Sequence, residues 1–403
     1  MREERVLFRI KRQFEQYKLY LIARELKWCL QNRIKHSEVV SLSSKGSSRG
    51  YVLLSYMNEA FLQGLNHPML NTHLHYWQSI EMANAFTELG YSVDVIHYHD
   101  QKFLPQKQYS VVVDVRHNME RLAALLDKEC IKIMHLDTAH ILFHNAAEAR
   151  RLLMLQQRRG VTLRPVRFEM PNLGIEYADC ATTCGNEFTV GTFRYANKPI
   201  YRLPIPSQIT CPWPANKDFG DSRKQFLWFA SGGLVHKGLD LVLEAFVGMP
   251  DLQLTVCGPI TEEPSFVSAY YKELYRTANI RTVGWLDIHS AQFMDLMRRC
   301  IGHVFTSCSE GGGACVIETM HAGLIPIVSY ESSVDVWDFG IMLKSASIED
   351  IQAAVRTIAD MPVSELESRS RQAWAFAREN HTREKFGQAF RKTLNTILAT
   401  SGW

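Results

Sequence analysis

The hydrophobic pattern sets the N-terminal segment apart from the rest of the chain. In residues 1–36, apolar side chains such as Val6, Ile10 and Phe14 recur at steps of three and four residues, which predicts an amphipathic helix. Residues 41–50 are rich in Ser and Gly and predict a flexible linker. We therefore expect residues 1–50 to form a helical arm and linker.

From Tyr51 onward, short apolar runs alternate with helical segments. The runs that predict strands lie at 51–57, 91–98, 110–115, 131–136, 178–183 and 199–205, and the helical segments at 72–89, 119–128 and 145–159. Strands that alternate with helices predict a parallel sheet with right-handed crossovers. This first series predicts a Rossmann-like domain over residues 51–210.

A second series of the same kind follows a segment rich in Pro, Gly and Asp, residues 211–222. Its predicted strands lie at 226–231, 252–258, 281–285 and 302–307, and its predicted helices at 238–246, 264–278, 289–300, 348–359 and 364–397. We expect a second Rossmann-like domain over 211–375. Residues 376–403 are expected to pack back on the first domain, in a helix that contains Trp374 and Phe386.

The predicted fold is therefore α/β, with two doubly wound parallel-sheet domains and an N-terminal helical arm. Open parallel sheets bind ligands beyond the carboxyl ends of their strands. Two such sheets in one chain predict a central cleft between the domains, with a hinge near residues 205–225.

Charge changes this picture mainly at the N-terminus. The whole chain of 403 residues has a formal net charge of +3, which argues against a nucleic-acid partner. Residues 1–50, however, carry 12 Lys and Arg against 5 Asp and Glu. The basic amphipathic arm over residues 1–36 has two interpretations: it binds an anionic membrane surface, or it packs one face on its own protein.

Cysteine usage and hydropathy bear on the compartment. The nine cysteines are scattered, and Cys180 and Cys184 lack partners at zinc spacing, which favours reduced thiols. No run of about 18 apolar residues predicts a spanning helix, and the N-terminus is too charged for a signal peptide. We expect a cytoplasmic protein, peripheral on the inner face of the membrane if the arm binds lipid.

Candidate functional residues are most concentrated in residues 305–328, whose pattern predicts a strand end, a turn, a helix and a second strand. The turn contains Gly311, Gly312 and Gly313, and Glu310 and Glu318 flank it with seven residues between them. Glycines before a helix let backbone N–H groups approach an anion closely. The stretch predicts a phosphate site with two acids placed for hydroxyl groups. The alternative is a tight turn before a buried helix.

Lys237 is the matching cation in the sequence. It follows Gly232 and Gly233 and precedes a predicted helix at Gly238. A lysine at this place can neutralise a diphosphate as a point charge. The alternative is an ordinary exposed lysine.

Three segments together resemble the retaining GT-B glycosyltransferases of family four. They are SGGLVHKGLDLVLEAF (231–246), LTVCGP with the following VGW (254–259 and 283–285), and SEGGGACVIETMHAGLIPIVS (309–329). The segments resemble that family's lysine loop, base-side loop and paired-glutamate motif in order and spacing. The resemblance implies an enzyme that binds a nucleotide diphosphate sugar and a glycan or glycolipid acceptor.

The resemblance also implies roles for single residues on the donor side. Lys237 would stabilise the leaving nucleotide, Glu310 would face the transferred sugar, and Glu318 would hold the ribose hydroxyls. The remaining donor-binding residues that it implies are Gly232, Gly233, Gly284, Trp285, Gly311, Gly312 and Gly313.

On the acceptor side, the resemblance places His135 beside the reacting sugar, followed by Asp137. His140 and His144 compete for the same role. The family commonly has a glycine pair before its first helix, where this chain has Thr72 and His73. Here side chains would line the cleft instead of bare backbone.

A second departure concerns the diphosphate. The family commonly has an arginine about five residues before the lysine, where this chain has Gly232 and Gly233. One of the two cations that would bind the diphosphate is then absent or comes from elsewhere, with Arg194 and Arg202 as candidates.

The expected activity is transfer of a sugar, with retention, from a nucleotide sugar to an acceptor hydroxyl in polysaccharide, lipopolysaccharide or glycolipid biosynthesis. No Asp-x-Asp motif stands in a suitable place, so we expect neither a metal nor a cofactor. The alternatives are nucleotide-sugar epimerisation, glycan phosphorolysis, or a catalytically silent nucleotide-sugar-binding protein.

Overall fold

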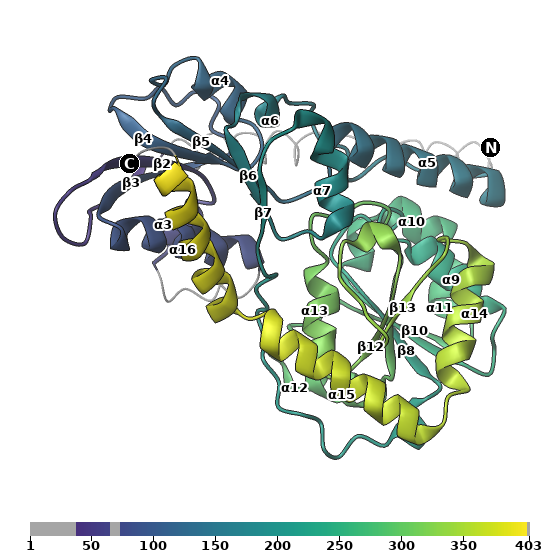
Figure 1. Cartoon of the computed structure of the whole chain (residues 1–403). Coiled ribbons are helices and arrows are strands. Elements are labelled where there is room, and N and C mark those ends of the chain that lie inside the picture. The colour runs from purple at the N-terminus through teal and green to yellow at the C-terminus, as the bar shows by residue number, and fades with distance from the viewer. Residues whose placement is uncertain (1–37, 65–72, 401–403) are drawn as a thin grey trace, which may run out of the picture.

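The computed structural model describes residues 38–64 and 73–400, which form two α/β domains, each built on a largely parallel sheet (Figure 1). This confirms the predicted fold class. The predicted helical arm over residues 1–36 lies outside the described residues, and so do Thr72 and the last three residues of the chain.

The first domain contains a seven-stranded sheet in the order β1-β3-β2-β4-β5-β6-β7, in which β1 alone runs antiparallel to its neighbour. Its strands are β1 (Val40–Leu42), β2 (Gly50–Tyr56), β3 (Tyr91–His97), β4 (Tyr109–Asp114), β5 (Ile131–Leu136), β6 (Cys180–Thr183) and β7 (Ile200–Arg202). Its helices are α2 (Glu59–Leu62), α3 (Leu74–Glu88), α4 (Met119–Ala123), α5 (Ile141–Arg159), α6 (Gly174–Tyr177) and α7 (Glu187–Phe193), which the 3-10 turn η2 (Arg194–Ala196) extends.

The second domain contains a six-stranded parallel sheet in the order β10-β9-β8-β11-β12-β13. Its strands are β8 (Gln225–Phe229), β9 (Gln253–Cys257), β10 (Ile280–Gly284), β11 (Gly302–Phe305), β12 (Ile325–Val328) and β13 (Ile341–Met342). Its helices are α8 (Phe219–Ser222), α9 (Leu239–Val247), α10 (Pro264–Ala269), α11 (Tyr271–Arg276), α12 (Ala291–Arg299), α13 (Ala314–His321), α14 (Ile348–Ala359) and α15 (Val363–Asn380), with 3-10 turns η3 (Ile260–Glu262) and η4 (Tyr330–Ser332).

The start of the first domain differs from the sequence prediction. The linker predicted at 41–50 overlaps β1, which pairs with β3 in the register Val40 to Val95. With three residues, Val-Ser-Leu, β1 is too short for its alternation to stand out from the Ser- and Gly-rich segment that follows it. The prediction of a loose linker is therefore wrong at its beginning, and the sheet starts about ten residues earlier than Tyr51.

The single C-terminal helix predicted at 364–397 is two helices, α15 and α16 (Arg383–Thr400). Trp374 lies in α15 and donates its indole N–H to the Cys211 carbonyl at 2.9 Å, on the side of the second domain. Phe386 lies in α16 and packs against Trp77 of α3, with ring centroids 5.7 Å apart. The chain therefore crosses back to the first domain after Asn380, and the placement of Trp374 in the crossing helix is wrong.

The two domains meet along α5, which runs beside the second domain in Figure 1. Leu155 on α5 belongs to the apolar core of the second domain. Arg151 donates to the Thr306 carbonyl at 2.7 Å, and Arg158 pairs with Asp240 at 2.6 Å. Apolar and charged contacts together hold the domains against each other next to the cleft.

Candidate active site

A cavity of about 790 Å³ lies between the domains and is lined by both of them. It sits beyond the carboxyl ends of both sheets, as expected for open parallel sheets. The residues that the sequence singled out and that line it are His73, His135, Asp137, Gly232, Lys237, Trp285, Glu310, Gly311, Gly312, Gly313 and Glu318. Residues more than 230 positions apart in the sequence therefore share one site.

Lys237 and Glu310 form an ion pair at the second-domain wall of this cavity. The side chains are 8% and 12% exposed. Ser307 Oγ donates to the same Glu310 oxygen at 2.6 Å. Burial would raise the pKa of Glu310, but the charges of Lys237 and His236 and these hydrogen bonds outweigh it and lower the pKa. Glu310 is therefore an ionised carboxylate, and Lys237 is fixed at the cavity wall.

The glycine turn offers backbone donors next to this pair. Among the described residues, the N–H groups of Gly311, Gly312 and Gly313 make no hydrogen bond. Helix α13 begins immediately after them, so its dipole adds a positive end to the same place. Three unpaired amides and one ammonium group around a cavity favour an anionic ligand.

Close packing also explains why glycines occupy this turn. A Cβ atom on Gly311 would lie 2.3 Å from the Asp137 carbonyl carbon, and one on Gly312 would lie 3.2 Å from the Cys184 oxygen. Gly312 has φ of +130°, which residues with a side chain rarely adopt. The turn therefore touches the first domain directly, so these glycines are needed for packing, whereas the anion site stays a prediction.

Glu318 lies on α13 and lines the cavity. Burial raises its pKa to about 8, although the charge of Arg383 and a hydrogen bond from the Gln208 backbone oppose this. Its carboxyl group therefore takes up or releases a proton near neutral pH, and a ligand that donates hydroxyl hydrogens would favour the ionised form.

Trp285 directly follows β10. Its side chain is 66% exposed and lines the cavity. Gly284 ends β10 with φ of +85° and accepts a hydrogen bond from the Gly258 N–H at 2.9 Å, so it shapes the strand end and does not line the cavity. An exposed indole face in a cavity is suited to stacking on a planar ring.

His135 and Asp137 lie at the end of β5, on the first-domain wall. His135 Nδ1 bonds Thr182 Oγ1 at 2.8 Å, and burial lowers the pKa of His135 to about 4, so the ring is neutral. Asp137 pairs with Arg116 at 2.7 Å. Burial opposes ionisation of Asp137, but Arg116 and then His75 lower its pKa to about 2. His135 can therefore act as a neutral hydrogen-bonding group, whereas the charge of Asp137 is already paired with that of Arg116.

His73 caps α3, and its Nδ1 accepts from the His75 N–H at 3.3 Å. The two competitors of His135 lie elsewhere. His144 is buried between the domains and does not line the cavity, and His140 caps α5 beside Tyr195.

Gly233 has a different environment from the one expected of a phosphate-binding glycine. Its N–H donates to Glu263 Oε1 at 2.6 Å, and the next N–H, of Leu234, donates to the same oxygen at 3.0 Å. A Cβ atom on Gly233 would lie 2.5 Å from Cγ of Arg167. The Gly233 amide is therefore occupied by a carboxylate, and the missing side chain makes room for an arginine.

The two arginines proposed as the second diphosphate-binding cation, Arg194 and Arg202, do not line the cavity. Arg202 pairs with Asp335 at 2.6 Å, and Arg194 is 76% exposed and lies 3.8 Å from Glu187. Sequence reasoning missed the cationic residues that do line it, Arg116 and Arg167. Both lie in segments without periodicity, where the sequence carries no signal that distinguishes them from other arginines.

A cluster with the composition of a metal site lies behind the cavity. One ligand atom each of His144, Glu148 and His236 lie within 4.8 Å of one another. However, His144 Nε2 donates to the Arg167 carbonyl at 2.7 Å, and its Nδ1 bonds the hydroxyls of Thr138 and Ser309. The imidazole of His144 is thus fully used by the protein, and the cluster is better described as a polar network between the domains.

Comparison with known proteins agrees with this geometry. Residues 215–378 match the family model of the glycosyl transferases group 1. The match supports a glycosyltransferase enzyme, and it covers the lysine loop and the glycine turn. No curated protein matches the sequence.

Several solved structures share the fold. Sucrose-phosphate synthase from Thermosynechococcus elongatus aligns with a TM-score of 0.61 at 12% identity, over 87% of this chain and 99% of that chain. Anabaena HepE in complex with UDP and glucose aligns with a TM-score of 0.54 at 11% identity, over 86% and 99%. A variant of S. aureus TarM in complex with fondaparinux, α-GlcNAc-glycerol and UDP aligns with a TM-score of 0.51 at 13% identity, over 71% of this chain and 55% of TarM. The chain thus spans just over half of TarM. At these identities, the likeness shows the fold alone.

Proposed function

We propose that this protein transfers a sugar from a nucleotide diphosphate sugar to an acceptor hydroxyl, with retention at the anomeric carbon. The observation that supports this most directly is the buried Lys237–Glu310 pair beside three unpaired glycine amides. A cation and backbone donors around one cavity suit a diphosphate leaving group, and the adjacent carboxylate suits a sugar. The match of residues 215–378 to a glycosyltransferase family supports the same assignment.

In this proposal, the donor lies along the second-domain wall of the cavity. Trp285 stacks on the base, and Glu318 accepts hydrogen bonds from the ribose hydroxyls. Lys237 and the amides of the glycine turn bind the diphosphate. This placement is supported by the lining of the cavity, because Trp285 and Glu318 line the same cavity as the Lys237–Glu310 pair.

The chemistry follows from the charges. As the bond from the anomeric carbon to the diphosphate breaks, negative charge grows on the leaving oxygen, and Lys237 and the amides stabilise it. The acceptor hydroxyl attacks from the same face, and its proton passes to the departing phosphate. No metal ion is required in this scheme, because the protein supplies the positive charge.

On the first-domain wall, His135 is placed to contact hydroxyl groups of the transferred sugar or of the acceptor. Its ring is neutral, and among the described residues its Nε2 makes no hydrogen bond. We further propose a glycan or glycolipid acceptor and a cytoplasmic enzyme of polysaccharide, lipopolysaccharide or glycolipid biosynthesis. No helix in the described part of the chain is long and apolar enough to cross a membrane.

A donor screen tests the proposed function. Purified protein is incubated with UDP-, GDP- and ADP-sugars, and the released nucleoside diphosphate is measured by mass. We expect slow hydrolysis of one donor class in the absence of acceptor. If no donor is bound or hydrolysed, the proposed function is wrong. If proton magnetic resonance shows an epimerised nucleotide sugar without release of diphosphate, the alternative of epimerisation is correct.

A further inference from the structure

We infer that Arg167, from the first domain, supplies the second cation of the diphosphate site. This inference rests on the proposed function and adds to it the source of the charge that the lysine loop lacks. Gly232 and Gly233 stand where an arginine would be expected before Lys237, so the second domain has no cation at that place. Arg167 lines the same cavity as Lys237 but comes from the loop between α5 and α6.

The side chain of Arg167 passes directly over the glycine pair. A Cβ atom on Gly233 would lie 2.5 Å from Arg167 Cγ and 2.9 Å from its Cδ. The positive φ of Gly233, +90°, makes a side chain there still less favourable. Gly233 and Arg167 are therefore complementary. The absence of a side chain at Gly233 leaves room for the side chain of Arg167 from the other domain.

The guanidinium group of Arg167 is unpaired in the part of the chain that the structure describes. Among the described residues, it makes no hydrogen bond or ion pair, and its Nε is buried without one. Its charge acts on both walls: it contributes, after burial, to the lowered pKa of His73, and it offsets part of the burial that raises the pKa of Glu263. An unpaired guanidinium at the edge of a cavity is costly unless a ligand completes it.

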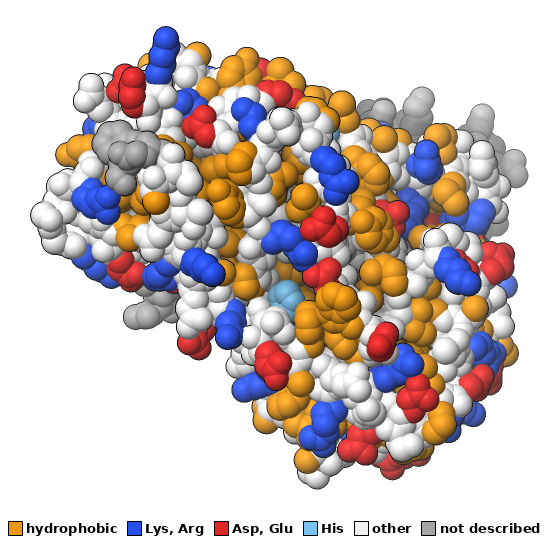
Figure 2. Space-filling model, viewed as in Figure 1, with side chains coloured by type: hydrophobic (Ala, Val, Ile, Leu, Met, Phe, Trp, Pro, Cys, Tyr) orange, Lys and Arg blue, Asp and Glu red, His pale blue; other side chains and the backbone are white. Residues whose placement is uncertain are grey.

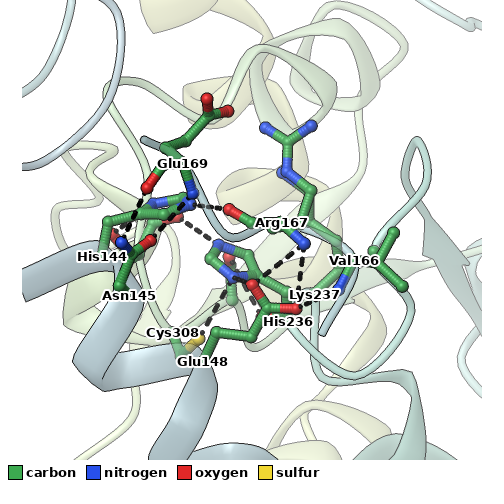
Figure 3. Close-up of polar contacts among 12 residues, drawn as sticks. His144, Asn145, Glu148, Val166, Arg167, Glu169, His236, Lys237 and Cys308 are labelled. Carbon is green, nitrogen blue, oxygen red and sulfur yellow. Dashed lines mark hydrogen bonds and ion pairs between the residues drawn. The ribbon is translucent and has the colours of Figure 1, made fainter. Parts of the chain in front are cut away.

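The backbone of Arg167, in contrast, is held on both sides. Its N–H donates to both oxygens of Glu148 at 3.0 Å, and its carbonyl accepts from His144 Nε2 at 2.7 Å. Asn145 fixes the same loop through two bonds to the Glu169 backbone, at 2.9 and 3.0 Å. Figure 3 shows the guanidinium directed away from these contacts, with no dashed line reaching it.

The same contacts lead to the lysine of the second domain. Glu148 Oε2 lies 3.7 Å from His236 Nδ1, and His236 Nε2 donates to the Ser309 carbonyl at 2.7 Å. His236 directly precedes Lys237, and Ser309 directly precedes Glu310. One buried network thus positions an arginine from the first domain and a lysine from the second domain at one cavity.

A diphosphate is the ligand that these two cations fit best. The planar guanidinium can donate two parallel hydrogen bonds to phosphate oxygens, whereas Lys237 acts as a point charge. Arg116, the other arginine of the cavity, is already bound to Asp137 and Glu169. Arg167 is therefore the arginine that remains available to a ligand among the described residues of this cavity.

The test compares nucleoside di- and monophosphate binding in matched variants. Arg167→Gln removes the charge but keeps a side chain long enough to pack beside Gly233. Arg164→Ala removes an exposed arginine from the same loop and is the control for net charge. Isothermal titration with UDP, GDP and ADP first identifies the nucleotide that the wild-type protein binds, and the variants are then titrated with that diphosphate and its monophosphate.

We expect Arg167→Gln to weaken diphosphate binding by about ten-fold or more, as for loss of one charge-assisted contact, and monophosphate binding by much less. Arg164→Ala should bind both as the wild-type protein does. The inference is overturned if Arg167→Gln binds the diphosphate within two-fold of wild type, or if it loses both nucleotides equally. Failure of the wild-type protein to bind any of the nucleotides would instead overturn the proposed function.

Discussion

Replacing Lys237 by Ala tests the ion pair at the centre of the proposed site. The change removes the cation that the proposal assigns to the leaving diphosphate, and it leaves Glu310 as a carboxylate with a side chain only 12% exposed. Removing one partner of a buried pair typically costs about 3–5 kcal/mol of stability. Because Ser307 still donates to Glu310 at 2.6 Å, we expect a value near the lower end, about 3 kcal/mol.

The same change should lower turnover by at least about ten-fold, equivalent to about 1.4 kcal/mol of transition-state stabilisation. Urea unfolding followed by tryptophan fluorescence measures stability, since Trp228 is fully buried in the second domain. Nucleoside diphosphate release from the donor measures turnover. The two effects need to be separated, because a destabilised protein can lose activity for structural reasons.

The double variant Lys237→Ala/Glu310→Gln separates them. Without the negative charge, the cost of an unpaired carboxylate disappears, so we expect most of the lost stability to return. Activity should not return, because the cation is still missing. The reasoning is refuted if Lys237→Ala is as stable and as active as wild type, or if the double variant regains activity along with stability.

Four further predictions concern the proposed donor site and the N-terminal arm. Burial raises the pKa of Glu318 to about 8, so the folded protein keeps a proton that the unfolded chain loses above the ordinary pKa of a glutamate. The free energy of unfolding should therefore decrease as the pH rises from that ordinary pKa to 8. Urea unfolding of Glu318→Gln should lack this decrease. Ribose hydroxyls favour the ionised carboxylate, so nucleotide affinity of the wild-type protein should increase as the pH is raised toward 8, by up to about ten-fold per pH unit. Titration of Glu318→Gln at the same pH values should show no such increase. Trp285→Ala should weaken nucleotide binding by about five-fold, roughly 1 kcal/mol of stacking, with an unchanged unfolding midpoint because the side chain is 66% exposed; an unchanged affinity would remove the indole from the base site. Deletion of residues 1–36 should abolish sedimentation with anionic vesicles and leave activity on soluble acceptors, and equal sedimentation without the arm would contradict membrane binding.

The second-domain wall of the cavity could be predicted from the sequence, because its polar residues lie in short contiguous motifs. The glycine turn, both glutamates and Lys237 each stand next to a strand or helix whose hydrophobic pattern is strong. The alternation of strands and helices then places them at the same edge of one sheet. The structure brings these residues to one cavity.

The first-domain wall of the cavity and the contacts between the domains could not be predicted in this way. Arg167 lies in a loop, and its place over Gly233 depends on how the two domains meet. His144 is a candidate from the sequence only for the role of His135, and nothing local shows that His144 and Glu148 face a loop and the other domain. The break between α15 and α16 was missed for a related reason, since a helical pattern continues on both sides of it while the packing partner changes.

The surface adds a further constraint on partners. Acidic and basic side chains are interspersed over both domains on the face shown in Figure 2, without a continuous basic field. Nucleic-acid binding through the phosphate backbone requires such a field. This face therefore gives no support to a nucleic-acid partner, in line with the small net charge of +3.

The most direct test of the central claim is the anomeric form of the sugar that the wild-type protein releases from its nucleotide α-sugar donor. Proton magnetic resonance follows the reaction with water as acceptor, before the free sugar equilibrates, and Lys237→Ala serves as the inactive control. Attack from the face of the leaving group predicts that the α anomer appears first, together with the nucleoside diphosphate. Initial release of the β anomer would contradict retention, and release of no nucleoside diphosphate from any donor would contradict the proposed transferase itself.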